Sequence, residues 1–306
     1  MPSIACFGAA NIDRTARCLV ELVLRSSNPV EVGQSAGGVA RNVATNLVHL
    51  GNKVSLSTVV GSDANGDELL RALEADGIDT SDALRREGHQ TASYTAVLDH
   101  DGELLIGLAD MAIYDEVDRA AFETADRKHD ADAWFIDANL PDGCLDALVA
   151  AGSSTIVAAS TVSTPKAPRL AAHLDKIDIL FANRAEAAVL VGHDIQSNDD
   201  ALLAATRLLE KGVGLVFVTL GPGGAAVAGS NERLVLPAIP GAARDVVGAG
   251  DAFAAGALAA LLESASLEDA MLLGLATASI TVEIDGPTDP GLNKTRVEER
   301  MRHRVA

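Results

Sequence analysis

The chain alternates short apolar runs with longer helical patterns, and this alternation constrains its fold more than any other feature. The run LVFVTL at 215–220 is almost wholly apolar, which is typical of a strand buried on both faces of a parallel sheet. We expect strands at about 3–9, 54–60, 133–137, 155–159, 178–182, 215–220, 224–229 and 232–236. We expect helices at about 38–50, 65–76, 143–151, 184–191, 199–211, 251–263 and 267–283. This order predicts an α/β fold with a doubly wound, mostly parallel sheet flanked by helices, and with ligands at the carboxyl ends of the strands.

The segment 87–110 departs from that pattern. Polar and apolar residues alternate in it, and the sequence DHDG at 99–102 supplies a turn between two strands. Such alternation marks strands with one face in water. Together with residues 11–35, the segment is expected to form a small β lid on a single domain that spans 1–306.

Charge and composition limit the partners of the chain. Its net charge of −19 over 306 residues repels nucleic acid, and an anionic small molecule needs backbone N–H groups or a metal ion to bind. Three widely spaced cysteines, Cys6, Cys18 and Cys144, fit a reduced protein without a disulfide framework or a zinc site. The sequence shows no signal peptide and no apolar run long enough for a membrane span. We therefore expect a cytoplasmic protein that binds neither nucleic acid nor a membrane.

One acid stands at the mouth of a very apolar helix in the stretch RDVVGAGDAFAAG. Asp251 follows the small residues Gly248, Ala249 and Gly250 directly. Asp is a favoured N-cap, and its charge suits the positive end of the helix dipole. The small residues also leave backbone N–H groups free for phosphate oxygens, and the acid would then accept a proton from a hydroxyl that attacks the phosphate. A cap explains the acid but not the two flanking glycines, so the sequence leaves both interpretations open.

A second glycine-rich helix start lies in SAGGVARNVATN. Gly37 and Gly38 allow a polar ligand to approach the backbone, and Asn42 follows one turn later. The alternative is a glycine-rich turn with a buried asparagine. Asn11 and Asp13 follow the first strand and can face one crevice from an extended segment. Their carboxylate and amide groups suit the vicinal hydroxyls of a ribose.

Two further motifs follow buried strands. Asn183 and Glu186 lie three residues apart, a spacing that fits a helix capping box and also fits a site for Mg²⁺ and phosphate. Thr219, Gly221 and Gly224 fit a nucleotide groove or a simple hairpin turn. The chain has no GxGxxG after its first strand and no GxxxxGK[ST], so the dinucleotide fingerprint and the P-loop are both missing.

These four motifs, in this order and over nearly the whole chain, resemble the ribokinase-like (PfkB) family of carbohydrate and nucleoside kinases. The resemblance implies an ATP- and Mg²⁺-dependent transfer of a phosphoryl group to a primary hydroxyl, with Asp251 as base. It also allows a monovalent cation such as K⁺ near Asp245 and the loop at 285–291, and a homodimer formed through the lid. The family roles that it implies are an anion hole at Gly248, Ala249 and Gly250; a sugar site at Asn11, Asp13, Gly37, Gly38 and Asn42; a nucleotide site at Asn183, Thr219, Gly221 and Gly224; and Mg²⁺ held through water by Glu186.

Within the family, the stretches SNPVEVGQSAGGVARN, TASYTAVLDHDGELLIGLADM and STPKAPRL resemble the pseudouridine kinase subgroup. This implies phosphorylation of the 5′-hydroxyl of pseudouridine, with Lys166 balancing phosphate charge unless it is merely solvated. Val246 or Val247 stands where the family often has threonine, and Ser160–Thr161 where the subgroup often has Asp-Pro. Two alternatives stay open: another acceptor such as ribose, adenosine or fructose, and a catalytically silent nucleoside-binding regulator. The candidate base-reading residues are Thr91, Ser93, Asp110 and Asn139.

Overall fold

The computed structural model describes residues 1–118, 122 and 130–302. Its central sheet has eight strands in the order β14-β13-β12-β11-β10-β9-β1-β4. The strands from β12 to β4 are parallel, whereas β13 and β14 pair antiparallel at one edge. This confirms the predicted mostly parallel α/β sheet. The bounds are β1 Ser3–Phe7, β4 Lys53–Ser57, β9 Ala133–Asp137, β10 Ile156–Ser160, β11 Ile179–Asn183, β12 Leu215–Thr219, β13 Ala225–Ala228 and β14 Arg233–Leu236.

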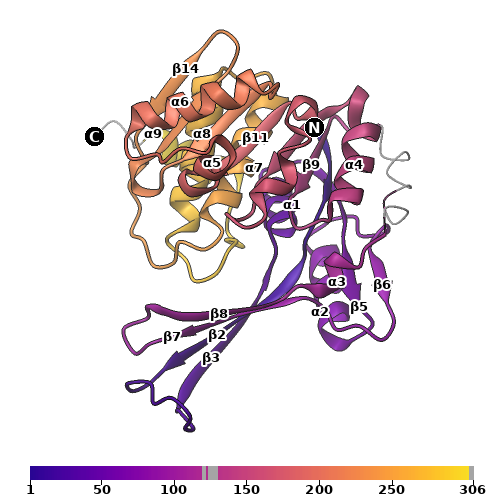
Figure 1. Ribbon diagram of the computed structural model, residues 1–306, viewed down its shortest axis with the longest axis vertical. Coiled ribbons are helices and arrows are strands. Elements are labelled where there is room, and N and C mark those ends of the chain that lie inside the picture. The colour runs from indigo at the N-terminus through magenta and orange to yellow at the C-terminus, as the bar shows by residue number, and fades with distance from the viewer. Residues whose placement is uncertain (119–121, 123–129, 303–306) are drawn as a thin grey trace.

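Helices cover both faces of the sheet (Figure 1). Successive side chains of a strand point to opposite faces, so Ala5 and Phe7 of β1 pack in one core, and Ile4 and Cys6 in the other. The first core is completed by α4, α5 and α6, and the second by α1, α2, α7, α8 and α9. The bounds are α1 Val39–His49, α2 Ala64–Ala75, α3 Ala112–Asp115, α4 Asp142–Ala151, α5 Arg184–Val191, α6 Asn198–Glu210, α7 Ala249–Leu262, α8 Leu267–Thr281 and α9 Lys294–Arg302.

A second sheet extends away from this body (Figure 1). Its four strands lie in the order β3-β2-β7-β8, with β2 Asn11–Cys18, β3 Val30–Gly37, β7 Ser93–Leu98 and β8 Leu104–Asp110. The turn expected between the last two strands is present, because the amide of Asp99 donates to the carbonyl of Glu103. Two short strands, β5 Val59–Gly61 and β6 Leu84–Arg86, pair separately near α2. Because β2 follows β1 after three residues, its first side chains lie where the two sheets meet.

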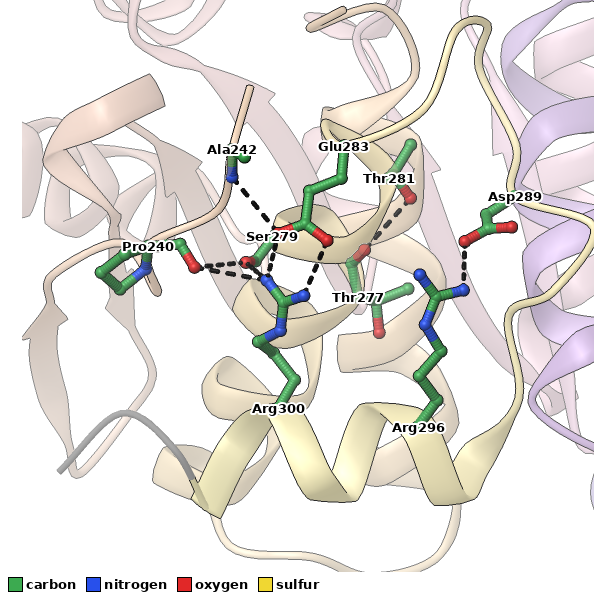
Figure 2. Close-up of polar contacts among 9 residues, drawn as sticks. All are labelled: Pro240, Ala242, Thr277, Ser279, Thr281, Glu283, Asp289, Arg296 and Arg300. Atoms are coloured by element: carbon green, nitrogen blue, oxygen red, sulfur yellow. Dashed lines mark hydrogen bonds and ion pairs between the residues drawn. The ribbon is translucent and has the colours of Figure 1, made fainter. Parts of the chain in front are cut away.

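The C-terminal helix α9 is fastened to the body by two arginines (Figure 2). Arg300 donates to Ser279 Oγ over 2.7 Å and to both carboxylate oxygens of Glu283 over 2.8 Å. Arg296 pairs with the buried carboxylate of Asp289. These contacts hold the segment 284–291 between α8 and α9. Among the residues that the structure describes, no helix combines the length and the apolar character that a bilayer span requires.

Candidate active site

Helix α7 begins two residues earlier than the sequence predicts, and this changes the role of Asp251. Gly248 is the N-cap, with φ of 77°, and its carbonyl accepts the amide of Ala252 over 2.9 Å. Asp251 is therefore the third helical residue, and the helix has no side-chain cap. The prediction that Asp251 caps the helix is wrong, because glycine in the left-handed region starts the helix at Ala249. The carboxylate still lies in the first turn, where the helix dipole favours negative charge.

The carboxylate of Asp251 is bonded to another helix. Asn42, in α1, donates from Nδ2 to Asp251 Oδ2 over 2.8 Å. Burial first, and then the charges of Asp137, Glu186 and Asp13, raise the pKa of Asp251 to about 7, whereas the hydrogen bond from Asn42 lowers it. A carboxylate with a pKa near neutrality is matched to proton abstraction from an alcohol. The geometry thus favours the interpretation of Asp251 as a base over that of a cap.

The small residues before Asp251 form a tight turn with free amides. The amide of Ala249 bonds to the carbonyl of Val246 over 3.3 Å, whereas those of Gly250 and Asp251 lie in the first helical turn and lack an intrahelical acceptor. A Cβ at Gly248 would overlap the carbonyl oxygen of Pro287. The turn therefore requires glycine at 248, and it presents N–H groups to an anion.

Residues predicted from three separate motifs line one cavity. Asn183, Glu186, Thr219, Gly250 and Asp251 surround it, together with side chains of α1 and β11. The nucleotide-side residues and the candidate base therefore share one space, as expected for side chains at the carboxyl ends of neighbouring parallel strands.

Asn183 and Glu186 form the capping box that their spacing allows. Asn183 Oδ1 accepts the amide of Glu186 over 2.9 Å, and Glu186 Oε2 accepts the amide of Asn183 over 2.9 Å. Thr161 Oγ1 also donates to Glu186 Oε2, over 2.5 Å. Sequence reasoning missed Thr161, which stands where the subgroup often has proline, and the structure shows that it holds this carboxylate.

The donor set of this cavity fits a metal ion bound chiefly by water and phosphate. Within residues 1–118, 122 and 130–302, no three His, Cys, Asp or Glu side chains cluster as ligands. Glu186 is a buried carboxylate on the cavity wall, with Asn183 beside it. Mg²⁺ keeps several waters and takes one or two carboxylates plus substrate phosphates, so these residues suit it.

The predicted sugar-site residues meet where β1, β2 and α1 come together. Asn11 Nδ2 donates to Asp13 Oδ1 over 2.6 Å, so both side chains lie on one face, as predicted. Gly37 is paired with Asn11 across β2 and β3. Gly38 has φ of 102°, and a Cβ there would overlap the carbonyl oxygen of Ala9. Burial raises the pKa of Asp13, which the Asn11 hydrogen bond opposes.

Asp137 organises this junction and was missed by sequence reasoning. It is fully buried at the end of β9. Its Oδ2 accepts the amides of Ala9 and Ala40, each over 2.9 Å, and its Oδ1 accepts the amide of Asn139 over 2.9 Å. The carboxylate thereby ties the end of β1 to the start of α1. The available signal was an acid at the end of an apolar strand, in the sequence WFIDANL.

The four candidate base-reading residues do not lie together, and Asn139 is placed at the end of β9. Ser93 pairs with Asp110 across β7 and β8, beside Ile12 of β2. Thr91 lies apart from them, because its buried hydroxyl donates to Asp63 Oδ1 over 2.6 Å and accepts the amide of Gly61 over 3.1 Å. The Thr91 hydroxyl is therefore committed to the start of α2.

The remaining predicted site residues are Lys166 and the loop glycines Gly221 and Gly224. Lys166 Nζ contacts Asn139 Oδ1, at the end of β9, and burial lowers the pKa of this lysine. The structure thus places Lys166 beside Asn139, one of the candidate base-reading residues. Gly221 and Gly224 flank a short 3₁₀ turn between the antiparallel strands β12 and β13, so the hairpin interpretation of this motif is correct as far as the backbone goes.

Comparisons with known proteins agree with this geometry. The sequence profile of the pfkB family of carbohydrate kinases matches residues 1–295. The chain is 27% identical to the pseudouridine kinase of Escherichia coli K12, over 96% of this chain and 95% of that one. It is 32% identical to a 1-phosphofructokinase of Haloferax volcanii, over 86% of this chain and 87% of that one.

The fold agrees as well. Ribokinase of Arabidopsis thaliana, solved in complex with ribose and ATP, superposes with a TM-score of 0.86 at 22% identity, over 98% of this chain and 99% of that one. The family membership that the motifs imply is confirmed, since the family profile matches nearly the whole sequence. The chain belongs to the pfkB family of carbohydrate kinases.

Proposed function

We propose that this sugar or nucleoside kinase transfers the γ-phosphoryl group of ATP to the 5′-hydroxyl of pseudouridine. The observation that carries the chemistry is the half-buried Asp251, whose pKa is raised to about 7 and which lies beside free amides in a cavity shared with Glu186. The acceptor is supported by the 27% identity with the pseudouridine kinase of E. coli along almost the whole chain.

In this proposal the substrate hydroxyl lies between Asp251 and the γ-phosphate. A bond forms between the 5′-oxygen and the phosphorus, the bond to the bridging oxygen of ADP breaks, and the hydroxyl proton passes to Asp251. The amides of Gly250 and Asp251 stabilise charge on the phosphoryl oxygens. Asn11, Asp13 and Asn42 orient the ribose hydroxyls, and such alignment supplies much of the rate in phosphoryl transfer.

The nucleotide would lie along Asn183, Thr219, Gly221 and Gly224. Mg²⁺, when bound through water at Glu186, neutralises phosphate charge. The proposal includes a monovalent cation such as K⁺ near Asp245, whose carboxylate accepts the amides of Val247 over 2.9 Å and Gly286 over 3.1 Å. Omission of K⁺ from the assay, with Na⁺ and a bulky ammonium salt as replacements, tests that part.

Ser93, Asp110 and Asn139 would read the base. The contact of Lys166 with Asn139 supports a position for this lysine beside the acceptor instead of beside ATP. We further propose that the second sheet is a lid, since the β2 end of this sheet carries Asn11 and Asp13. Its closure would keep water from the phosphoryl group.

A homodimer through the lid is also part of the proposal. Several large apolar side chains of the second sheet are exposed, and alternate residues of one strand share a face. An exposed apolar patch of this kind marks an interaction surface, and a second copy of the chain would cover it. Sedimentation of the protein should give a dimer, and Ile106→Lys should give a monomer. The side chains concerned are Val30, Val32, Leu104, Ile106 and Leu108.

The test of the proposed function is ADP release with MgATP and a panel of acceptors. Pseudouridine should turn over strongly and uridine weakly, with ribose, adenosine and fructose as further members. A sugar phosphate is the second candidate acceptor, because the relative with 32% identity is a 1-phosphofructokinase. Turnover of fructose 1-phosphate in place of pseudouridine would support Asp251 as base but would contradict a nucleoside as the acceptor. No turnover with any acceptor would favour a nucleoside-binding regulator.

A further inference from the structure

Arg41 is a buried cation that contacts Asn42, the hydrogen-bond partner of the candidate base. It lies in the first turn of α1 with 8% of its surface exposed. Its Nη1 donates to Asn42 Oδ1 over 3.0 Å, to the carbonyl of Ala36 over 3.2 Å and to Thr288 Oγ1 over 3.4 Å. Among the described residues, Nε has no hydrogen-bond partner, and the guanidinium forms no ion pair at contact distance. A direct ion pair with one acidic side chain therefore does not explain why Arg41 is buried here.

The contact with Asn42 decides which end of the carboxamide meets the base. A carboxamide has an oxygen that only accepts and a nitrogen that only donates. Arg41 occupies the oxygen, so the nitrogen is left to donate to Asp251 Oδ2. The reversed orientation would set the oxygen against a carboxylate and the NH₂ group against a guanidinium, and both contacts would be repulsive.

We propose that Arg41 is a positioning residue, which fixes the carboxamide of Asn42 so that it donates to Asp251 and thereby sets the proton affinity of the base. The proposal rests on the role of Asp251 in the proposed function. Arg41 acts through Asn42 and does not itself touch the reacting atoms.

The charges around Asp251 make this orientation important. The acids that face it are Asp13 from β2, Asp137 from β9 and Glu186 from α5, and all three raise its pKa. The hydrogen bond from Asn42 lowers it. Arg41 carries the nearby positive charge, which interacts with Asp251, Asp13 and Asp76. If Asn42 turned around, the donor would be replaced by an acceptor, and the proton affinity of Asp251 would rise.

A double-mutant cycle separates orientation from charge. The variants are Arg41→Met, Asn42→Ala and the two combined, and the quantity is the pKa of Asp251. It is read from the acid limb of kcat/KM and, independently of turnover, from the infrared band of the protonated carboxyl that disappears in Asp251→Asn. A hydrogen bond to a charged group is worth about one to two pKa units, so Arg41→Met should raise the pKa of Asp251 by about one to two units.

The decisive result is the combined variant. If Arg41 acts mainly through Asn42, its removal shifts the pKa much less once Asn42 is alanine, because only the direct charge interaction with Asp251 is then left. Fully additive shifts would show that Arg41 acts on Asp251 by its charge alone and would overturn the proposal. A wild-type pKa in Arg41→Met would overturn it as well.

Two more variants serve as an alternative to Arg41→Met and as a charge control. Arg41→Lys retains the charge without the planar fork, so it serves where Arg41→Met does not fold. We expect its pKa shift to be partial and to vanish in the Asn42→Ala background, whereas a wild-type pKa would mean that charge alone suffices. Arg71→Met removes a positive charge from the exposed side of α2 and should leave the pKa unchanged. Because the infrared titration needs no acceptor, an inactive wild-type enzyme would contradict the proposed function without deciding the role of Arg41.

Discussion

Asn42 Nδ2 donates to Asp251 Oδ2 over 2.8 Å, joining two residues that are 209 positions apart in the chain. The first belongs to the helix of the proposed sugar site, and the second to the helix of the proposed anion site. The bond therefore connects the place where an acceptor would be held to the group that would take its proton. It also supplies the hydrogen bond that favours the charged form of a carboxylate surrounded by three other acids.

Replacement of the base should stop turnover and leave the fold intact. Asp251→Asn keeps the shape of the side chain and can still accept the Asn42 hydrogen bond, but it cannot take a proton. General-base catalysis is worth about 10²–10⁴ in rate, so we expect kcat for ADP release to fall by about that factor. Circular dichroism and the melting temperature should show a folded protein. Near-normal turnover in a folded variant would contradict the mechanism.

The rate should depend on the ionisation of Asp251. Burial raises its pKa to about 7, and the deprotonated form is the active base. We expect kcat/KM to be level above pH 7 and to fall about tenfold per unit well below it. The profile should be measured with a saturating MgATP concentration and a limiting acceptor. An acid limb with its midpoint near 4, the ordinary value for a carboxyl, would show that Asp251 is not the titrating group.

The ionisation of Asp251 should lower the stability of the folded protein at high pH. A folded-state pKa above the unfolded value favours folding below the unfolded pKa, and this contribution is lost as the pH rises through about 7. Asp251→Asn removes the charge, so we expect its melting temperature to exceed that of the wild type, more at pH 8 than at pH 5. The exposed Asp194, changed to Asn, is the control and should show no such pH dependence. An equal effect of Asp251→Asn at both pH values would contradict a raised pKa.

The sequence predicted the strands and the glycine-rich motifs because each is a local pattern. Asp251, Asn42 and Glu186 could be identified in this way, since small residues or strand ends mark their positions. Asp137 could not, because its partners Ala9 and Ala40 lie 128 and 97 residues away and nothing in its own segment indicates them.

The start of α7 and the role of Arg41 were also hidden from the sequence. The helix begins at Ala249 because Gly248 adopts a left-handed conformation against Pro287, a contact between distant segments. Arg41 is the one arginine of α1, and helical periodicity alone does not say which neighbour it contacts. A contact between distant segments decided the first feature, and the side-chain contact of Arg41 with Asn42 decided the second.

The turn before Asp251 should tolerate no side chain at 248. Gly248→Ala places a Cβ in the carbonyl of Pro287 at a positive φ, so the start of α7 must move. We expect turnover to fall by at least about tenfold, since small displacements of aligned groups are costly in phosphoryl transfer. Gly192→Ala is the matched control, with φ of 67° and no atom near its Cβ, and it should lose about 1 kcal/mol of stability without losing turnover. Equal activities of the two variants would show that the Pro287 contact does not position the base.

The contacts of Arg300, which fasten α9 to the body, should stabilise the fold, and this stabilisation should weaken in acid (Figure 2). The Arg300 hydrogen bonds lower the pKa of Glu283, so the stabilisation is present above the unfolded pKa and is lost as the pH falls through the folded one. Arg300→Met should lower the free energy of unfolding by about 1–2 kcal/mol at pH 7, measured by urea denaturation, and by less near pH 4. Arg302→Met removes an exposed arginine of the same helix, 3.9 Å from Glu298, and should change it by less than about 0.5 kcal/mol. If both variants lose the same stability at pH 7, the half-buried contacts of Arg300 do not fasten the helix.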